Sequence, residues 1–308
     1  MLRSTGEVLT HRKYGEHYHS LTIVTPEIGE RVVPGQFVSI RPPEGSAHIL
    51  RRPFSVYRVH KRGGWASTIE IVFDVRGPGT AHLSSLRTHA VVDVMGPLGR
   101  GFSLPRSRAH CLLVGGGIGA APLFFLADEL RNEGHRVDCI LGARSAALLL
   151  NAIEVRRLAS VYRITTEDGS TGERGLVTDV MEDTLLRCDS EIVYACGPHA
   201  MLAAVSRACV ERDVAVQVAV EELMACGYGV CMTCVMPVAR RSARRSQGDE
   251  VVYVRSCTEG PVLDGASVVW DGAPGPASAG DSELSPSGIA GGGFRFSEAA
   301  NEHPAPGN

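Results

Sequence analysis

The chain has 308 residues, of which 44% are hydrophobic, and this length and apolar content predict two or three domains rather than one. Its net charge of −3 excludes a strong general attraction to nucleic acid or to an anionic membrane. No apolar run reaches the roughly 18 residues that a membrane span needs, and the N-terminus lacks the apolar core of a signal peptide, so we expect a soluble, cytoplasmic protein.

Residues 1–104 carry short apolar or alternating runs that are typical of strands. These runs are SLTIVTP, GQFVSIRP, FSVYRV, TIEIVFDV and HAVVDVMGP, and glycine and proline separate them. Closely spaced short strands with turn signals between them indicate a small antiparallel β-barrel.

Residues 105–220 alternate between strands and helices. The apolar run His110–Val114 is followed by a glycine string and by a helix over 120–131, where leucines recur at helical spacing. Further strands are expected at 137–141, 161–165, 191–196 and 214–220, and further helices at 176–186 and 199–212. This alternation predicts a doubly wound parallel α/β sheet, so the whole chain is an α+β multidomain protein.

The last part of the chain is irregular. Residues 221–267 form a small cysteine-rich segment, and the basic stretch ARRSARRSQGDE within it resembles a solvated surface loop. Residues 268–308 are dominated by Gly, Ala, Ser and Pro, a composition that cannot bury enough apolar surface to offset the entropy of ordering. We expect this last segment to be a disordered tail.

Four of the nine cysteines fall within about 32 residues, at Cys226, Cys231, Cys234 and Cys257. Their spacing, C-x4-C-x2-C followed by a distant cysteine, is that of plant-type [2Fe–2S] proteins, where three close thiolates wrap one side of the cluster. Two glycines between the first two cysteines allow the backbone to pass close to the inorganic sulfides. Zinc is an alternative, but structural zinc sites usually pair two short C-x2–4-C knuckles and only one is present. Ordinary buried thiols are the other alternative.

A glycine loop spans residues 115–122, between a predicted strand and a predicted helix. Backbone N–H groups near Gly115, Gly117 and Gly119, together with the helix dipole, suit a pyrophosphate, although many α/β turns use glycine for tightness alone. No acidic residue ends the next strand; Arg144 follows it, and the sequence leaves open whether Arg144 binds the nucleotide or is solvated.

A second loop follows a later strand at Cys196, Gly197 and Pro198. Ligands of open α/β sheets bind at the carboxyl ends of strands, so Cys196 could approach a nicotinamide ring. The residues alone favour the plainer interpretation, in which Cys196 is a small buried residue before a turn.

Two short elements of the barrel region suit a phosphate or a flavin. Arg52, Pro53, Phe54 and Ser55 combine a charged donor with a hydroxyl on an extended strand, and the segment 77–80 combines backbone with the Thr80 hydroxyl. Surface strands and plain turns have similar compositions, so each element is weak alone.

In this order, the motifs R-P-F-S, G-x-G-T, G-P-L-G, the glycine loop and C-G-P resemble the ferredoxin reductase flavoprotein superfamily. The segments E-E-L-M-A-C-G (221–227) and C-T-E-G-P-V-L (257–263) are more specific. They are similar to the electron-transfer subunit of the NAD-dependent (class 1B) dihydroorotate dehydrogenase complex. The resemblance covers residues 5–268.

The resemblance implies a chain of carriers: NAD(H), FAD, the [2Fe–2S] cluster and the FMN of a separate catalytic subunit. That subunit interconverts dihydroorotate and orotate in pyrimidine (UMP) synthesis, and two copies of each chain are expected in a heterotetramer. The resemblance places the FAD in the barrel, against Arg52, Pro53, Phe54, Ser55, Val72, Phe73, Asp74, Gly79 and Thr80. The electrons then pass through a cluster bound by Cys226, Cys231, Cys234 and Cys257.

Three features depart from the family pattern. Asp74 stands where the family usually has a basic residue, the loop between Cys234 and Cys257 is long and basic, and the tail has no counterpart. An alternative function is a ferredoxin-reductase-like component that serves a hydrogenase, a glutamate or sulfide oxidoreductase, or an oxygenase. A second alternative is an iron–sulfur redox sensor whose basic insert contacts nucleic acid, but it leaves the glycine loop and the R-P-F-S element unexplained.

Overall fold

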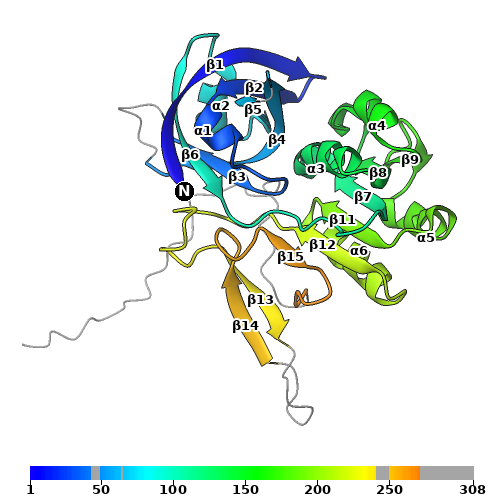
Figure 1. The fold of residues 1–308 in the computed structure, drawn as a ribbon. Helices are drawn as coiled ribbons and strands as arrows, with labels where there is room; N and C mark the ends of the chain where they lie inside the picture. Colours follow the sequence, from blue (N-terminus) through cyan, green and yellow to red (C-terminus); the bar gives the residue numbers. More distant parts are fainter. Residues whose placement is uncertain (43–48, 64, 241–249, 271–308) are drawn as a thin grey trace, which may run out of the picture. The chain divides into compact units, whose positions relative to one another are not determined.

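The computed structural model describes residues 1–42, 49–63, 65–240 and 250–270 (Figure 1). These described residues all belong to one compact unit by their contacts. The centre of the basic insert, 241–249, and the tail from 271 onwards lie outside the described residues. In the described part no helix is long and apolar enough to span a membrane.

The first part of the chain closes into a six-stranded antiparallel barrel, in the order β1-β2-β5-β4-β3-β6, drawn in blue to cyan in Figure 1. Every strand contributes buried aliphatic or aromatic side chains to one interior cluster, because alternate residues of a strand point to the same face. The strands are β1 (Leu2–Tyr14), β2 (Tyr18–Val24), β3 (Phe37–Ile40), β4 (Arg52–Arg62), β5 (Trp65–Asp74) and β6 (Val91–Leu98). The predicted small barrel is confirmed.

Two helices interrupt the barrel strands. The short helix α1 (Pro26–Gly29) follows β2, and α2 (Pro78–Ser85) follows β5. The segment 77–80, which we expected to be a turn or a phosphate contact, is the start of α2. Pro78 stands at the first helical position, where its missing N–H is not needed, and the Thr80 Oγ1 accepts hydrogen bonds from the N–H groups of Arg76 (2.9 Å) and Gly77 (3.2 Å).

The second part is a seven-stranded sheet in the order β10-β9-β8-β7-β11-β12-β15, drawn in green to orange in Figure 1. All neighbouring pairs are parallel except β12 with β15. The strands are β7 (His110–Gly116), β8 (Arg136–Ala143), β9 (Tyr162–Thr166), β10 (Glu173–Arg174), β11 (Ile192–Cys196), β12 (Ala215–Ala219) and β15 (Val262–Asp264). Every strand predicted in this region is present.

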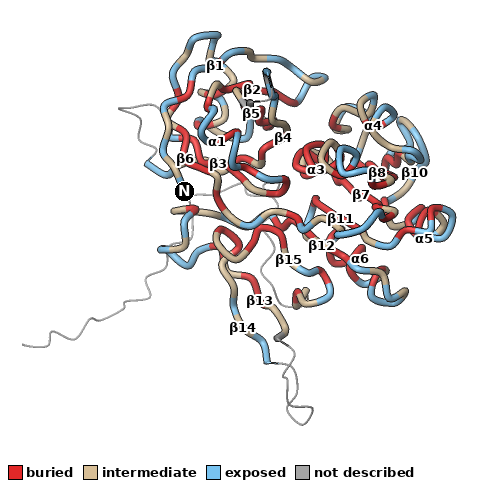
Figure 2. Tube along the Cα trace, viewed as in Figure 1, coloured by how far each residue is buried: buried red, intermediate tan, exposed pale blue. Residues whose placement is uncertain are grey.

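Helices cover both faces of this sheet, so the predicted doubly wound architecture is confirmed. Cys111 and Leu113 of β7 pack into one buried cluster with α3 and α4, whereas Leu112 and Val114 pack into another with α5 and α6. The helical elements are η1 (Gly117–Ala120), α3 (Ala121–Asn132), η2 (Ala146–Leu148), α4 (Ala152–Leu158), α5 (Val177–Cys188) and α6 (His199–Val210). Figure 2 shows the resulting buried centre of the sheet.

The cysteine-rich segment contains a hairpin that the sequence did not predict. Strands β13 (Val235–Arg240) and β14 (Glu250–Arg255) pair antiparallel on either side of the basic insert. The remote cysteine follows β14 directly, and β15 then joins the edge of the parallel sheet. The domain boundaries 1–104, 105–220 and 221–267 stay predictions.

The start of the expected tail is a correction. Val268 is buried and bridges to Val238 of the hairpin. The Trp270 ring contacts His199 edge-on, with centroids 5.0 Å apart, and its Nε1 donates to the Gly265 carbonyl. Residues 268–270 are therefore packed, because their apolar side chains cover α6 and the hairpin. The rest of the tail lies outside the described residues.

Candidate functional site

A cavity of about 270 Å³ lies where the barrel meets the edge of the parallel sheet. Barrel strands β3, β4 and β5 supply one wall, and the loop after β7 and the segment after β12 supply the other. Ligands of open α/β sheets bind at the carboxyl ends of the strands, and residues that follow the ends of β7 and β12 line this cavity. Its position between a barrel and a nucleotide-binding type of loop suits a planar group that exchanges electrons with a dinucleotide.

Six of the residues that the resemblance assigned to FAD line this cavity. They are Pro53, Phe54 and Ser55 on β4 and Val72, Phe73 and Asp74 on β5. The two strands lie side by side in the barrel, which brings these two short segments together. These six residues combine apolar side chains with one hydroxyl and one carboxylate, which suits an isoalloxazine ring, whose faces are apolar and whose edge is polar.

Arg52, Gly79 and Thr80 meet beside the cavity, at the start of α2. A Cβ atom on Gly79 would lie 3.0 Å from the Arg52 Nε, so the guanidinium lies against the first turn of the helix. Free N–H groups at a helix N-terminus and an arginine both attract phosphate. The donor set therefore fits the pyrophosphate of a dinucleotide cofactor.

Asp74 is paired rather than free. Its Oδ2 lies 3.5 Å from the Nε of Arg76, which also lines the cavity. The basic group that is absent at position 74 is thus supplied two residues later. Asp74 and Arg76 together leave this part of the cavity wall without net charge.

The two glycine-containing loops of the sheet are in direct contact. Cys196 lies opposite Gly115 in the β7–β11 register. A Cβ atom on Gly119 would lie 2.6 Å from the Cα of Gly197, and one on Gly116 would lie 2.8 Å from the Pro198 ring. Glycine is therefore required here for close packing of two loops, and the same packing leaves their N–H groups at the sheet edge.

Gly117 has a different role from its neighbours. Its φ of +53° lies in the left-handed region, and nothing lies within 4 Å of its Cβ position. The space beside it is open for a ligand.

Cys196, in contrast, is only 3% exposed, and burial raises the pKa of its thiol well above the usual value. Cys196 therefore contributes a small neutral side chain rather than a thiolate.

Arg144 is exposed at the end of β8. Its carbonyl accepts a hydrogen bond from the Asp168 N–H (3.1 Å), so the loops after β8 and β9 meet at this edge. The structure does not bring the Arg144 side chain into the cavity wall.

The four spaced cysteines form two pairs. The pKa values of Cys226 and Cys231 depend on each other, and the pKa of Cys257 depends on Cys234, so the members of each pair lie close together. In the described residues no group of three or more His, Cys, Asp or Glu is gathered for a single metal ion. A [2Fe–2S] cluster needs two thiolates at each of two irons, whereas structural zinc needs four ligands around one centre. Two close pairs of thiols suit the two irons of such a cluster.

The loop of residues 226–234, which we call the cysteine loop, is shaped for sulfur ligation. The N–H groups of Tyr228 (3.5 Å) and Val230 (3.3 Å) donate to the Cys226 sulfur. Gly227 and Gly229 have φ values of +78° and +89°, which turn these N–H groups inward at no steric penalty. Hydrogen bonds to sulfur stabilise the thiolate form that binds iron.

Cys231 is the ligand candidate nearest to solvent. A hydrogen bond from the Thr233 hydroxyl (3.2 Å), followed by backbone contacts, lowers the pKa of the exposed Cys231 thiol to about 6. Cys234 and Cys257 are 2% and 1% exposed. One pair thus faces the surface and the other faces the interior.

The remote cysteine is fixed by an ion pair. Arg255 binds Glu259 (Nε–Oε2, 3.1 Å) across the turn that contains Cys257. The Nη1 of Arg255 also donates to the Gly229 carbonyl (3.0 Å), in the loop of the first pair. Arg255 therefore ties the two separate parts of the cysteine site together.

Phe37 connects the cavity with the buried cysteines. It lines the cavity, and it shares one buried cluster with Cys234 and Cys257. Sequence reasoning did not identify Phe37, because only the closed barrel brings β3 beneath the cysteine loop. Sequence reasoning also assigned no role to Glu222, although the motif E-E-L-M-A-C-G contains this residue. Glu222 lies in the cavity wall because of the direction that the chain takes after β12.

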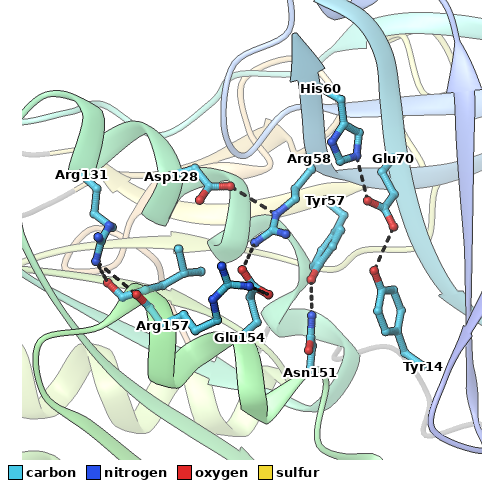
Figure 3. Close-up of polar contacts among 11 residues, drawn as sticks. Tyr14, Tyr57, Arg58, His60, Glu70, Asp128, Arg131, Asn151, Glu154 and Arg157 are labelled. Carbon is cyan, nitrogen blue, oxygen red and sulfur yellow. Dashed lines mark hydrogen bonds and ion pairs between the residues drawn. The ribbon is translucent and has the colours of Figure 1, made fainter. Parts of the chain in front are cut away.

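Ion pairs and a hydrogen bond hold the barrel against α3 and α4, as Figure 3 shows, and we call this set of contacts the joint. Arg58 on β4 binds Asp128 (3.2 Å) and Glu154 (3.0 Å), and it is 20% exposed. The Asn151 amide donates to the Tyr57 hydroxyl (2.9 Å). This joint fixes the two walls of the cavity relative to each other.

The barrel, the parallel sheet and the cysteine loop define an oxidoreductase component with the ferredoxin-reductase fold. Family models agree with this class: residues 113–207 match an oxidoreductase NAD-binding domain. Residues 221–269 match the iron–sulfur cluster binding domain of dihydroorotate dehydrogenase B.

Curated relatives specify the family. The chain is 38% identical to the electron transfer subunit of dihydroorotate dehydrogenase B (NAD(+)) from Geobacillus thermodenitrificans, with 87% of this chain and 98% of that protein covered. It is 37% identical to the protein of the same name from Desulforamulus reducens, with coverages of 80% and 90%. The chain belongs to the family of electron transfer subunits of dihydroorotate dehydrogenase B.

Solved structures share the fold. One is an NADH-dependent reduced ferredoxin-NADP oxidoreductase studied for flavin-based electron bifurcation. It matches with a TM-score of 0.72 and 30% identity, over 86% of this chain and 90% of that one. The ferredoxin reductase of carbazole 1,9a-dioxygenase matches with a TM-score of 0.58 and 20% identity, over 69% of this chain and 66% of that one, and this shows the fold alone.

Proposed function

We propose that this chain is the electron-transfer subunit of a dihydroorotate dehydrogenase complex in de novo UMP synthesis. It passes electrons between the FMN of a catalytic partner subunit, its own [2Fe–2S] cluster, its own FAD and NAD⁺. It works in the cytoplasm as a heterotetramer with two copies of each chain. Orotate chemistry belongs to the partner, so this chain needs no proton-transfer residue for dihydroorotate.

FAD occupies the cavity and the start of α2. The ring lies against Pro53, Phe54, Ser55, Val72, Phe73 and Asp74, and the pyrophosphate lies against Arg52, Gly79 and Thr80. The fit is supported by the cavity volume of about 270 Å³ and by the contact of the Arg52 guanidinium with Gly79. Arg76 offsets the charge of Asp74. When bound, FAD converts between hydride transfer and single-electron transfer.

NAD(H) binds at the edge of the parallel sheet. Gly115, Gly117 and Gly119 shape the loop that receives its pyrophosphate, and Cys196, Gly197 and Pro198 shape the facing loop. The buried Cys196 keeps this surface neutral, and the open space beside Gly117 admits the ligand. The cavity lies next to this edge, as transfer of a hydride to FAD requires.

Cys226, Cys231, Cys234 and Cys257 hold the [2Fe–2S] cluster. Two observations support this assignment: the buried Cys234 and Cys257 share one cluster with the cavity residue Phe37, and two backbone N–H groups donate to the Cys226 sulfur. Phe37 and its neighbours keep water away from the space between the two cofactors. The cluster therefore links the FAD of this chain with the FMN of the partner.

The catalytic partner docks over the exposed side of the cysteine loop. Val230 and Met232 flank Cys231 and are 73% and 53% exposed, and Leu223 is 67% exposed. An exposed apolar rim around a redox centre suits a protein interface, which excludes water and shortens the path for electrons. The FMN of the partner would approach the cluster here.

Reconstitution with the catalytic subunit tests this function. The two chains, expressed together, should co-purify as a brown complex that contains FAD, FMN and iron and that forms NADH when dihydroorotate and NAD⁺ are supplied. Neither chain alone should support this reaction. Failure to co-purify, together with no dihydroorotate-dependent NADH, would contradict the proposal.

A second candidate is a reductase component that serves another acceptor. The observation that favours it is the 30% identity, over 86% of the chain, to the NADH-dependent reduced ferredoxin-NADP oxidoreductase. Under this hypothesis the purified chain passes electrons from NADH or NADPH to a ferredoxin, and dihydroorotate is no donor. The same reconstitution distinguishes the two candidates.

A further inference from the structure

Glu222 is a carboxylate in an unusual position. It lies in the wall of the cavity, two residues after Val220 and four residues before the first cysteine of the cysteine loop. Its Oε1 is buried and has no hydrogen-bond partner. A buried carboxylate oxygen without a partner is costly, and such groups are retained where a bound ligand or a proton completes them.

The surroundings of Glu222 favour its protonated form. The other charged residues of the cavity wall are Asp74, Arg76 and Glu221. Arg76 is engaged with Asp74, and no cation among the residues that the structure describes pairs with Glu222. Burial raises the pKa of Glu222 to about 7. The group can therefore be found in either protonation state near neutral pH.

The redox chemistry of the proposed flavin needs one proton per cycle. Hydride transfer from NADH gives NAD⁺ and FADH⁻ and consumes no proton. Removal of two electrons from FADH⁻ through the cluster returns FAD and releases one proton. In the direction of NAD⁺ reduction the same proton must be supplied as the electrons arrive. Proton exchange thus belongs to the half-reaction between FAD and the cluster.

We propose that the Glu222 carboxyl group is the proton donor and acceptor of the flavin in this half-reaction, an inference that rests on the proposed binding of FAD in the cavity. Glu222 precedes the cysteine loop and lines the flavin cavity, so it lies on the side where the flavin exchanges electrons with the cluster. Proton transfer and electron transfer are then served by one short segment, 220–226.

The test compares Glu222→Gln with the matched variant Glu221→Gln in the full chain loaded with FAD and cluster. Infrared difference spectra on reduction of the flavin should show a protonated-carboxyl band in the wild type and in Glu221→Gln, and none in Glu222→Gln. Electron exchange between flavin and cluster, followed by rapid-mixing absorbance, should slow by about 10²-fold in Glu222→Gln and lose its pH dependence near neutrality.

Five results distinguish the outcomes. A band that persists in Glu222→Gln, or that disappears equally in Glu221→Gln, overturns the assignment. Loss of FAD from Glu222→Gln shows that the residue holds the flavin instead, and this also overturns it. Absence of FAD from the wild-type chain overturns the proposed function as well. Band loss confined to Glu222→Gln, with flavin content unchanged, supports the inference.

Discussion

A Cβ atom on Gly119 would lie 2.6 Å from the Cα of Gly197, so the glycine loop and the C-G-P loop touch through their backbones. The two motifs lie far apart in sequence but form one surface at the edge of the sheet. Two strands that pair in parallel, β7 and β11, bring them together. The glycines are thus needed for loop packing, and the proposed NAD(H) site depends on that packing.

Gly119→Ala should destabilise the fold and weaken NADH binding. The added methyl group meets backbone atoms that cannot rotate away, so we expect a loss of about 3 kcal/mol in the free energy of unfolding and a raised KM for NADH. Gly117→Ala is the control: its site is open, and it carries only the penalty of about 1–2 kcal/mol for a left-handed residue. Equal unfolding curves in denaturant for wild type and Gly119→Ala would contradict the packing.

Arg58→Met should loosen the joint between the barrel and the helices α3 and α4. It removes two ion pairs of a largely buried guanidinium, and charge-assisted hydrogen bonds of this kind contribute about 2 kcal/mol. Arg157 also contacts Glu154, at 3.9 Å, but it is 76% exposed, so Arg157→Met should change stability by less than about 0.5 kcal/mol. Denaturant titration of both variants measures the difference, and equal effects would refute a special role of Arg58.

The stability loss of Arg58→Met should shrink in acid. Burial raises the pKa of Asp128, and Arg58 opposes this rise. A carboxyl group whose pKa is raised by folding stabilises the folded protein at pH values below its pKa in the unfolded state. This contribution disappears as the pH rises through its pKa in the folded state. Without Arg58 the pKa rises further, so the deficit is largest at neutral pH and falls as Asp128 is protonated. A deficit that is constant with pH would show that the Asp128 charge is not involved.

Cys231→Ser should abolish the cluster and leave FAD bound. Cys231 is exposed and belongs to the outer pair, so its loss opens one iron to solvent without disturbing the barrel. Cys139→Ala is the control, because Cys139 is buried in β8, far along the chain from the cysteine loop. Iron and sulfide analysis, with flavin content from the visible spectrum, measures both. Loss of flavin with the iron would show that the two sites depend on each other.

Arg52→Ala should reduce FAD retention. The guanidinium lies against Gly79 at the start of α2, and its removal takes one charge-assisted contact of about 1.5–3 kcal/mol from the pyrophosphate. Arg3→Ala, which removes an arginine that pairs with Asp93 on the barrel surface, should leave flavin content unchanged. Flavin content after extensive dialysis measures the effect. Full retention in Arg52→Ala would remove this residue from the site.

Local patterns in the sequence predicted most of the fold. Apolar runs such as His110–Val114 predict strands, because a strand buried on both faces has no polar alternation. The strand β1 was missed, because only Gly6 and Val8 of it are buried and polar residues such as Arg3 occupy much of it. The helix α2 was also missed, because Gly77, Pro78 and Gly79 are typical of a turn and the helix that follows is short.

The candidate site was predicted only where a motif marks it. Cysteine spacing identified the cysteine loop, and the resemblance supplied the cavity residues on β4 and β5. Phe37 could not be predicted, because its contact with the cysteine cluster arises from barrel closure. Glu222 lies inside the motif E-E-L-M-A-C-G, but only the three-dimensional structure shows that its Oε1 has no hydrogen-bond partner. Arg76, which replaces the expected basic residue, depends on how the chain turns after β5.

The proposed electron path runs from NADH through FAD to the [2Fe–2S] cluster. Its most direct test is an electron paramagnetic resonance spectrum of the purified chain, reduced with NADH in the absence of oxygen. We expect the signal of a one-electron-reduced [2Fe–2S] cluster, with about two irons per chain, and its loss in Cys231→Ser. The signal appears only if NADH reduces FAD and FAD reduces the cluster. Zinc at these cysteines, or a cluster that dithionite reduces but NADH does not, would refute this electron path.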